Sequence, residues 1–157
     1  MKAKYLLMLV LFLGFGTNLM SQDGHIKSRI RAEYIQFLNE EGFSLSIDSD
    51  GDIKFKKEGL TYYIVVKDEE SPQYITVYGP GFKVGGEKGF VYEKALAASN
   101  MVNRQQRSVK LCVYDNNVSV TIELPIANTD AFKAVFYKII LYLNAGRDLF
   151  REEYDKL

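Results

Sequence analysis

The segment from residue 109 to residue 124 constrains the fold most, because its side chains alternate between apolar and mostly polar ones. Period-two alternation predicts a β-strand with one buried face. Asn116 and Asn117 interrupt the pattern near its middle, and asparagine is a frequent turn residue. The segment is therefore expected to form an antiparallel hairpin with one apolar face. The residues predicted on that face are Val109, Leu111, Val113, Val118, Val120, Ile122 and Leu124.

An amphipathic helix is predicted directly after this hairpin. Pro125 is expected to end the strand, and residues 128–130 (Asn-Thr-Asp) offer an N-cap. Apolar side chains then recur at spacings of three and four, which is typical of a helix with one buried face. Gly146 is expected to bend or end the helix before a charged tail. The apolar residues of this helix are Phe132, Val135, Phe136, Ile139, Ile140 and Leu143.

The first half of the chain shows the same two periodicities. Residues 26–38 carry apolar side chains at helical spacing, and Gly42 is placed to end that helix. Alternating segments follow, separated by turns rich in Asp and Gly, so a meander of antiparallel strands is expected. The predicted strands lie within residues 43–47, 53–55, 60–67 and 74–78.

The middle of the chain completes the predicted fold. Residues 79–89 are rich in glycine and predict a long, mobile connection. Residues 90–105 return to a helical pattern, with small side chains on one face. The resulting order is helix, three or four strands, helix, two strands, helix. This order predicts an α+β fold, a two-layer sandwich in which three helices lie on one face of an antiparallel sheet of five to six strands.

The N-terminus has the layout of an export signal. Lys2 and Lys4 precede an uncharged apolar run, and small or polar residues follow it through Ser21. The run is shorter than the roughly 20 apolar residues that a membrane-spanning helix needs. We therefore expect a signal peptide over residues 1–21, a single domain over residues 22–157, and a periplasmic or secreted location. Membrane contact is expected only through the signal segment before cleavage; its retention as an anchor is the alternative.

The composition excludes some classes of function. Removing Lys2 and Lys4 from the 20 basic residues leaves 18 against 20 acidic ones, a net charge near −2. A chain with this balance is not expected to bind nucleic acid. Cys112 is the only cysteine, so no intrachain disulfide can form. About 135 residues are enough to bury a core without cross-links.

Several segments together share features with a known family. The segments are Ile47–Phe55 with its Asp-Ser-Asp-Gly-Asp turn, the tyrosine-rich strand at Gly59–Val66, the helix Ala95–Asn103 with Asn100 and Asn103, and the final hairpin with its Phe-rich helix. Together they resemble the YbjN family, and the resemblance extends over residues 26–150. It implies the type III secretion chaperone-like fold and a chaperone-like binding module, with dimer formation as one option and no catalytic residue. Familiar members are mostly cytoplasmic, whereas the predicted signal sends this domain outward, so their regulatory roles do not transfer directly.

Three acidic residues, Asp48, Asp50 and Asp52, invite comparison with a calcium-binding EF-hand loop. Such a loop has glycine at position six and glutamate at position twelve, where this chain has Ile53 and Gly59. Asp and Gly also serve the backbone geometry of a hairpin turn directly. No metal site is therefore expected.

Two other motifs lack the partners that their chemistry needs. The glycines of residues 79–89 do not match a dinucleotide-binding fingerprint, because Val84 stands where the third glycine is required. They do not match a P-loop either, because no Gly-Lys is followed by Ser or Thr. Cys112 would need an activating base within hydrogen-bond reach, and the one histidine, His25, lies near the expected mature N-terminus. We expect no catalytic residue and no cofactor.

If the apolar strand residues face the helices, the opposite side of the sheet carries several tyrosines. Such a side is typical of an interaction surface, although tyrosine also suits any half-exposed strand. The leading hypothesis is a non-enzymatic exported binding module that binds a polypeptide partner, or a second copy as a homodimer, through this side. The alternatives are a sugar- or lipid-binding protein that uses the glycine-rich loop, and an unrecognised hydrolase. The candidate binding residues are Tyr63, Val65, Tyr78, Tyr114 and Thr121, with Cys112 on the same side.

Overall fold

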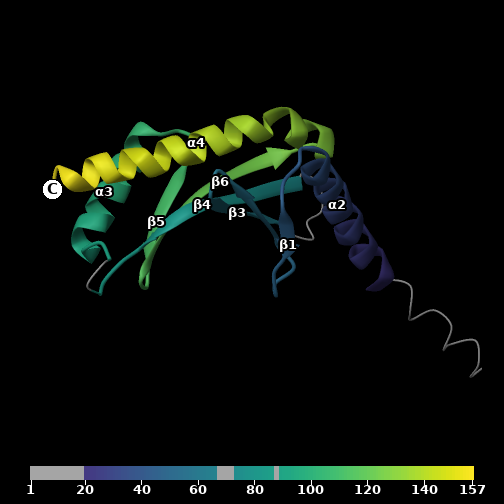
Figure 1. The fold of residues 1–157 in the computed structure, drawn as a ribbon, viewed down its shortest axis with the longest axis horizontal. Coiled ribbons are helices and arrows are strands. Elements are labelled where there is room, and N and C mark those ends of the chain that lie inside the picture. Colours follow the sequence, from purple (N-terminus) through teal and green to yellow (C-terminus); the bar gives the residue numbers. More distant parts are fainter. Residues whose placement is uncertain (1–19, 67–72, 87–88) are drawn as a thin grey trace, which may run out of the picture.

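The computed structural model of the protein describes residues 20–66, 73–86 and 89–157. Over these residues it contains three helices and one six-stranded antiparallel sheet (Figure 1), which confirms the predicted α+β fold and the order of its elements. The predicted signal segment lies outside the described residues except for residues 20 and 21. No helix in the described ranges combines the length and the apolar character needed to cross a membrane. The elements are α2 (Met20–Glu40), β1 (Leu45–Ile47), β2 (Ile53–Lys57), β3 (Leu60–Val65), β4 (Gln73–Lys83), α3 (Tyr92–Gln105), β5 (Lys110–Tyr114), β6 (Asn117–Ile126) and α4 (Thr129–Asp155).

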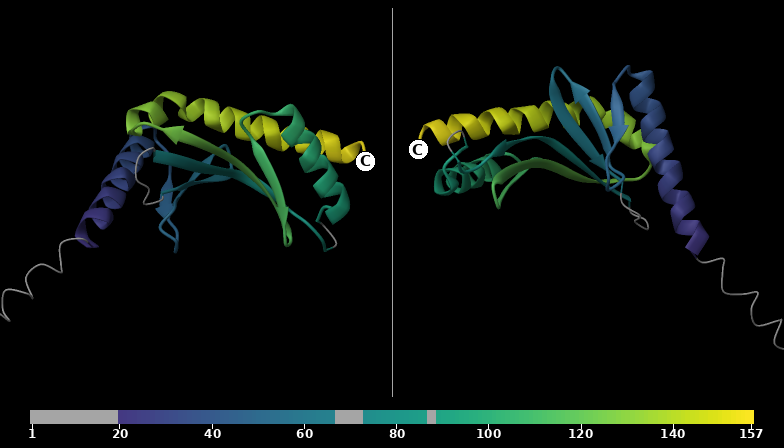
Figure 2. Two further views of the ribbon diagram at one scale, coloured as in Figure 1. Left: turned by 180° about the vertical axis from the view of Figure 1, so that it is seen from behind. Right: turned by 60° about the horizontal axis from the view of Figure 1, so that its bottom comes forward.

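The strand order in the sheet is β1-β2-β3-β4-β6-β5. The final hairpin therefore docks with β6 against β4 and leaves β5 at one edge, while β1 forms the other edge. The long helix α4 runs across one face of the sheet, with α2 towards the β1 end and α3 at the β5 end (Figures 1 and 2). The helix α4 thus covers one face of the sheet, while α3 packs at its β5 end and α2 lies beside its β1 edge.

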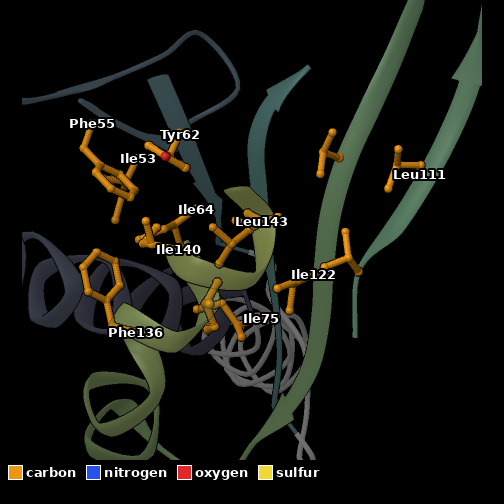
Figure 3. Packing of buried hydrophobic residues seen from close by; sticks show 14 of the residues in the cluster. Ile53, Phe55, Tyr62, Ile64, Ile75, Leu111, Ile122, Phe136, Ile140 and Leu143 are labelled. Carbon is orange, nitrogen blue, oxygen red and sulfur yellow. The ribbon is translucent and has the colours of Figure 1, made fainter. Parts of the chain in front are cut away.

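The core lies between α4 and the sheet. Phe136, Ile140 and Leu143 project from α4 towards apolar side chains of the strands (Figure 3). Each fully buried side chain of this size contributes roughly 1.5–3 kcal/mol to folding. The alternation predicted for the strands is confirmed in β2, β3, β5 and β6, where most inward-facing residues are buried, but not in β1, where Ile47 is 44% exposed. The buried strand residues include Ile53, Phe55, Tyr62, Ile64, Ile75, Val77, Leu111, Val118, Val120 and Ile122.

The helix α2 begins earlier than the sequence pattern predicts, at Met20 rather than near residue 26. Its end is as predicted. The backbone N–H of Phe43 donates to the carbonyl of Leu38 at 2.9 Å, and that of Gly42 donates to Asn39 at 3.0 Å. This pair of hydrogen bonds is the Schellman arrangement that favours glycine after a helix.

The glycine-rich stretch is the main difference from the prediction. The strand β4 continues through it to Lys83, with an irregular register between Gly79 and Phe82. A Cβ atom on Gly81 would lie 2.4 Å from the carbonyl oxygen of Val118, so the glycine permits close approach to β6. The backbone N–H of Phe90 then donates to Lys83 at 2.9 Å. The prediction of a long mobile connection over residues 79–89 was therefore wrong for its first half.

Three smaller predictions also need correction. The turn between β5 and β6 is formed by Asp115 and Asn116, one residue earlier than expected. Pro125 does not end β6, because β5 reaches only as far as Thr121 and proline is tolerated in an edge segment. Gly146 lies inside α4, where a Cβ atom would be 2.7 Å from a Val109 methyl group. Its glycine allows the helix to pack closely on the sheet, and the expected charged tail continues the helix.

Candidate functional site

We call the side of the sheet that no described helix covers the tyrosine face. Its central row runs across five strands in the order Lys54, Tyr63, Tyr78, Thr121 and Lys110, since these residues are direct neighbours in the strand register. Neighbouring strands lie about 4.8 Å apart, so the row extends over about 19 Å. The structure thus brings Tyr63, Tyr78 and Thr121 together.

The other two predicted residues lie on the same face but outside the central row. Val65 belongs to the next row, in which it pairs with Thr76, and Thr76 pairs with Glu123. Tyr114 lies at the hairpin end of β5, opposite Asn117. The face is therefore a band across the sheet with a tyrosine at its β5 end.

The side chains of the tyrosine face differ in how far they are exposed to solvent. Tyr63, Val65 and Tyr78 are half-buried, and Tyr114 is 49% exposed. Tyr74 is 51% exposed and lies on the same face of β4 as Tyr78, four residues away. The sequence reasoning missed Tyr74 as a site residue. The signal that could have found it is the even spacing between Tyr74 and Tyr78, which places both side chains on the same face of one strand.

Thr121 requires a correction. It lies on the tyrosine face as predicted, but its side chain is only 4% exposed. Its hydroxyl donates to the backbone carbonyl of Lys110 at 3.2 Å, and the larger side chains of the same row flank it. Thr121 therefore supports the hairpin and offers little surface for contact.

Charged groups surround the central tyrosine. Burial raises the pKa of Tyr78, and the neighbouring Tyr114, Glu123 and Asp52 raise it further. The ammonium group of Lys110 donates to Glu123 at 3.0 Å, and this hydrogen bond raises the pKa of Lys110. The phenol of Tyr78 therefore stays protonated at neutral pH and can act as a hydrogen-bond donor.

The Lys54 ammonium group lies 5.7 Å from the centre of the Tyr63 ring. Such a cation–π contact holds the ring and leaves its other side available for stacking. The tyrosine face thus combines aromatic area with hydrogen-bond donors and acceptors. That chemistry suits the binding of a polypeptide, because tyrosine is enriched at protein interfaces. The two nearby carboxylates, Asp52 and Glu123, lie on the exposed sheet face, and Glu123 is engaged by Lys110.

The acidic turn between β1 and β2 has a structural explanation. The Asp48 carboxylate accepts hydrogen bonds from the backbone N–H groups of Asp50 at 3.0 Å and Asp52 at 2.9 Å. This Asx-type arrangement stabilises the turn directly. Among the described residues, no group of three or more His, Cys, Asp and Glu side chains is placed to hold a metal ion.

Aromatic rings fill the space beneath the described part of the glycine-rich segment. The rings of Phe82 and Phe150 stack with their centres 4.6 Å apart, and the ring centres of Phe90 and Tyr154 are 4.5 Å apart. These ring contacts make the described part of the glycine-rich segment part of the packed core.

Cys112 is exposed on the tyrosine face. The side chain of its hypothetical partner, His25, lies outside the described part of the chain.

A pocket of about 470 Å³ lies between α2 and the start of α4, and the sequence reasoning did not predict it. Asn128 forms the N-cap of α4 by accepting a hydrogen bond from the N–H of Ala131 at 2.9 Å. Thr129 donates to Glu33, which also pairs with Arg29 at 3.8 Å. Because its acidic and basic groups interact with one another, the pocket has no dominant charge.

Comparison of the chain with protein-family models, with curated proteins and with solved structures gave no match in any of the three. The similarity to the YbjN family therefore stays a prediction from sequence.

Proposed function

We propose that the protein is a non-enzymatic exported binding module that uses the tyrosine face to bind a polypeptide, either another envelope protein or a second copy of itself. The observation that supports the proposal is the placement of Tyr63, Tyr74, Tyr78 and Tyr114 on one face that the described helices leave uncovered. Tyrosine supplies a large contact area with little loss of side-chain freedom, together with a hydroxyl group for orientation. A chaperone-like role agrees with the resemblance to the YbjN family.

The first test replaces Tyr63 and Tyr114 together with serine in the mature domain. We expect weaker self-association in sedimentation equilibrium, or weaker capture of the partner, because both aromatic contacts are removed. The matched control replaces Tyr137 and Tyr142 with serine, since these tyrosines are exposed on α4. Thermal unfolding of both variants verifies that they fold.

The second test places a photo-crosslinking amino acid at position 114 in cells that export the protein, with position 142 as the control. We expect a crosslinked polypeptide, identifiable by mass spectrometry, from position 114 and not from position 142. The proposal is wrong if neither a dimer nor a crosslinked polypeptide depends on the tyrosine face.

A further inference from the structure

Two arginines on the helix side of the sheet share one aromatic ring. Arg147 and Arg151 lie one turn apart on α4, and the guanidinium carbon of each is 5.4 Å from the centre of the Phe82 ring. Phe82 projects from β4 towards the helices and is buried. We call these two residues the arginine pair. It lies in the helix layer, away from the tyrosine face.

The donors of the arginine pair are poorly satisfied within the described residues. The Nε of Arg147 is buried and has no hydrogen-bond partner there. Its one ion pair within the described ranges joins Nη1 to the exposed Asp148 at a distance of 3.6 Å, which is long. Arg151 makes no ion pair or hydrogen bond with the described part of the chain. A buried donor without an acceptor is unfavourable, and so are two like charges one helical turn apart.

Neighbouring acceptors are already occupied. Near Arg147, the side-chain oxygen of Asn144 accepts a hydrogen bond from the Tyr62 hydroxyl at 2.8 Å. The Glu58 carboxylate, which also acts electrostatically on Tyr62, pairs with Lys57 at 2.9 Å. These groups do not neutralise the arginine pair, and the exposed Asp148 carboxylate is the one acidic group that an ion pair within the described residues brings to it.

We propose that the arginine pair is a binding site for an oxyanion, the phosphate or carboxylate group of a ligand. A guanidinium group stacked on a ring has a fixed plane, and its N–H groups match two oxygens of such an anion at once. Arg147 is the more rigid arm, since its side chain is 17% exposed, and the exposed Arg151 is the more mobile one. An anion between them supplies acceptors and offsets their repulsion. This site is independent of the proposed polypeptide-binding function.

The experiment follows the Arg147 Nε–H resonance by NMR while inorganic phosphate or citrate is added at constant ionic strength. Constant ionic strength separates binding from screening. We expect a saturable shift with phosphate, with citrate or with both; saturation by one alone identifies the class of anion. The proposal is overturned if the shift grows linearly with both anions, since linear growth indicates no specific site.

Variants of Arg151 test its role in the proposed anion site. Arg151→Gln should weaken anion binding by roughly tenfold or more, because a charge-assisted contact is lost. Arg151 is exposed, so this variant is expected to fold, and Arg151→Lys should bind with intermediate affinity because it keeps the charge without the planar fork. The control is Arg104→Gln, which removes an exposed arginine of α3. Equal affinity of the Arg151→Gln and Arg104→Gln variants would also overturn the proposal.

Discussion

Glu58 has a backbone conformation that few side chains tolerate. It forms the two-residue turn between β2 and β3 together with Gly59, and φ is 52° at Glu58 and 79° at Gly59. Positive φ at both positions defines a type I′ turn, in which asparagine is favoured first and glycine second. Ordinary L-residues carry a cost of roughly 1–2 kcal/mol in the left-handed conformation. The turn therefore stores avoidable strain at Glu58.

Replacement of Glu58 by Asn should raise the free energy of unfolding by about 0.5–1 kcal/mol, because asparagine tolerates positive φ better. The variant also loses the surface ion pair between Lys57 and Glu58, whose atoms are 2.9 Å apart, and such pairs contribute little. Glu58→Gln is the control, since it removes the charge and keeps the strain. Urea unfolding compares the two variants, and equal stability would contradict the explanation.

The sequence predicts which residues form the candidate site where alternation along a strand decides the face on which a side chain lies. This alternation places Tyr63, Tyr78 and Tyr114 on one face without knowledge of which strands are neighbours. The burial of Thr121 depends on strand order, because Lys110 and Tyr78 flank it only once β6 lies between β4 and β5. The arginine pair could not be predicted, since the glycine-rich sequence around Phe82 predicts a loop.

At the level of elements, one side chain joins α3 to the edge of the sheet. The Asn103 amide donates to the backbone carbonyl of Leu111 at 2.8 Å and accepts from the Leu111 N–H at 2.8 Å. These are the hydrogen bonds that a neighbouring strand would make with β5. The helix α3 is thus fixed on β5 by hydrogen bonds as well as by its small buried residues Ala95 and Ala98.

Asn103→Ala should lower the free energy of unfolding by about 1–2 kcal/mol, because two hydrogen bonds to the partly buried Leu111 backbone are lost. Asn100→Ala is the matched control, since Asn100 is exposed on the same helix and the change has the same effect on helix propensity. Urea denaturation measures both. The role assigned to Asn103 is refuted if the two variants are equally stable.

Element boundaries were predicted well where periodicity is strong and poorly where glycine interrupts it. The strands around residues 45–65 and 110–124 follow from alternation alone. Gly81 and Gly146 were interpreted as signs of a loop and a helix end, yet both lie inside regular elements where another chain segment approaches closely. A sequence shows that a glycine is present but not whether flexibility or close packing requires it.

For the whole molecule, α2 is attached to the rest through aromatic contacts with the first turns of α4. The Tyr34 and Phe132 ring centres are 4.7 Å apart, and those of Phe37 and Phe136 are 5.2 Å apart. Tyr34 is 4% exposed. Burial, with a smaller effect of the neighbouring Glu33, raises its pKa to about 12 from an ordinary value of 10.0. Loss of the proton from this phenol therefore destabilises the fold.

Alkaline pH should consequently weaken the fold. Below pH 10 the phenol is neutral in both states, whereas between pH 10 and 12 the unfolded chain loses the proton and the folded chain keeps it. At pH 11.5 the loss attributable to Tyr34 is about 2 kcal/mol. Tyr34→Phe should remove that part of the pH dependence in urea unfolding, and Tyr92→Phe, at an exposed position, should not. Identical pH profiles for both variants would rule out this role of Tyr34.

The two edges of the sheet limit how copies of this protein can assemble. One edge is β1, which is only three residues long, and at the other Asn103 occupies the outward backbone groups of Leu111. Neither edge is a good template for strand addition, which is the route to open-ended fibres. If copies pair through the tyrosine face around a two-fold axis, each pairing covers the surface that the next copy would need. Assembly would then be self-limiting, and it would end at a closed pair.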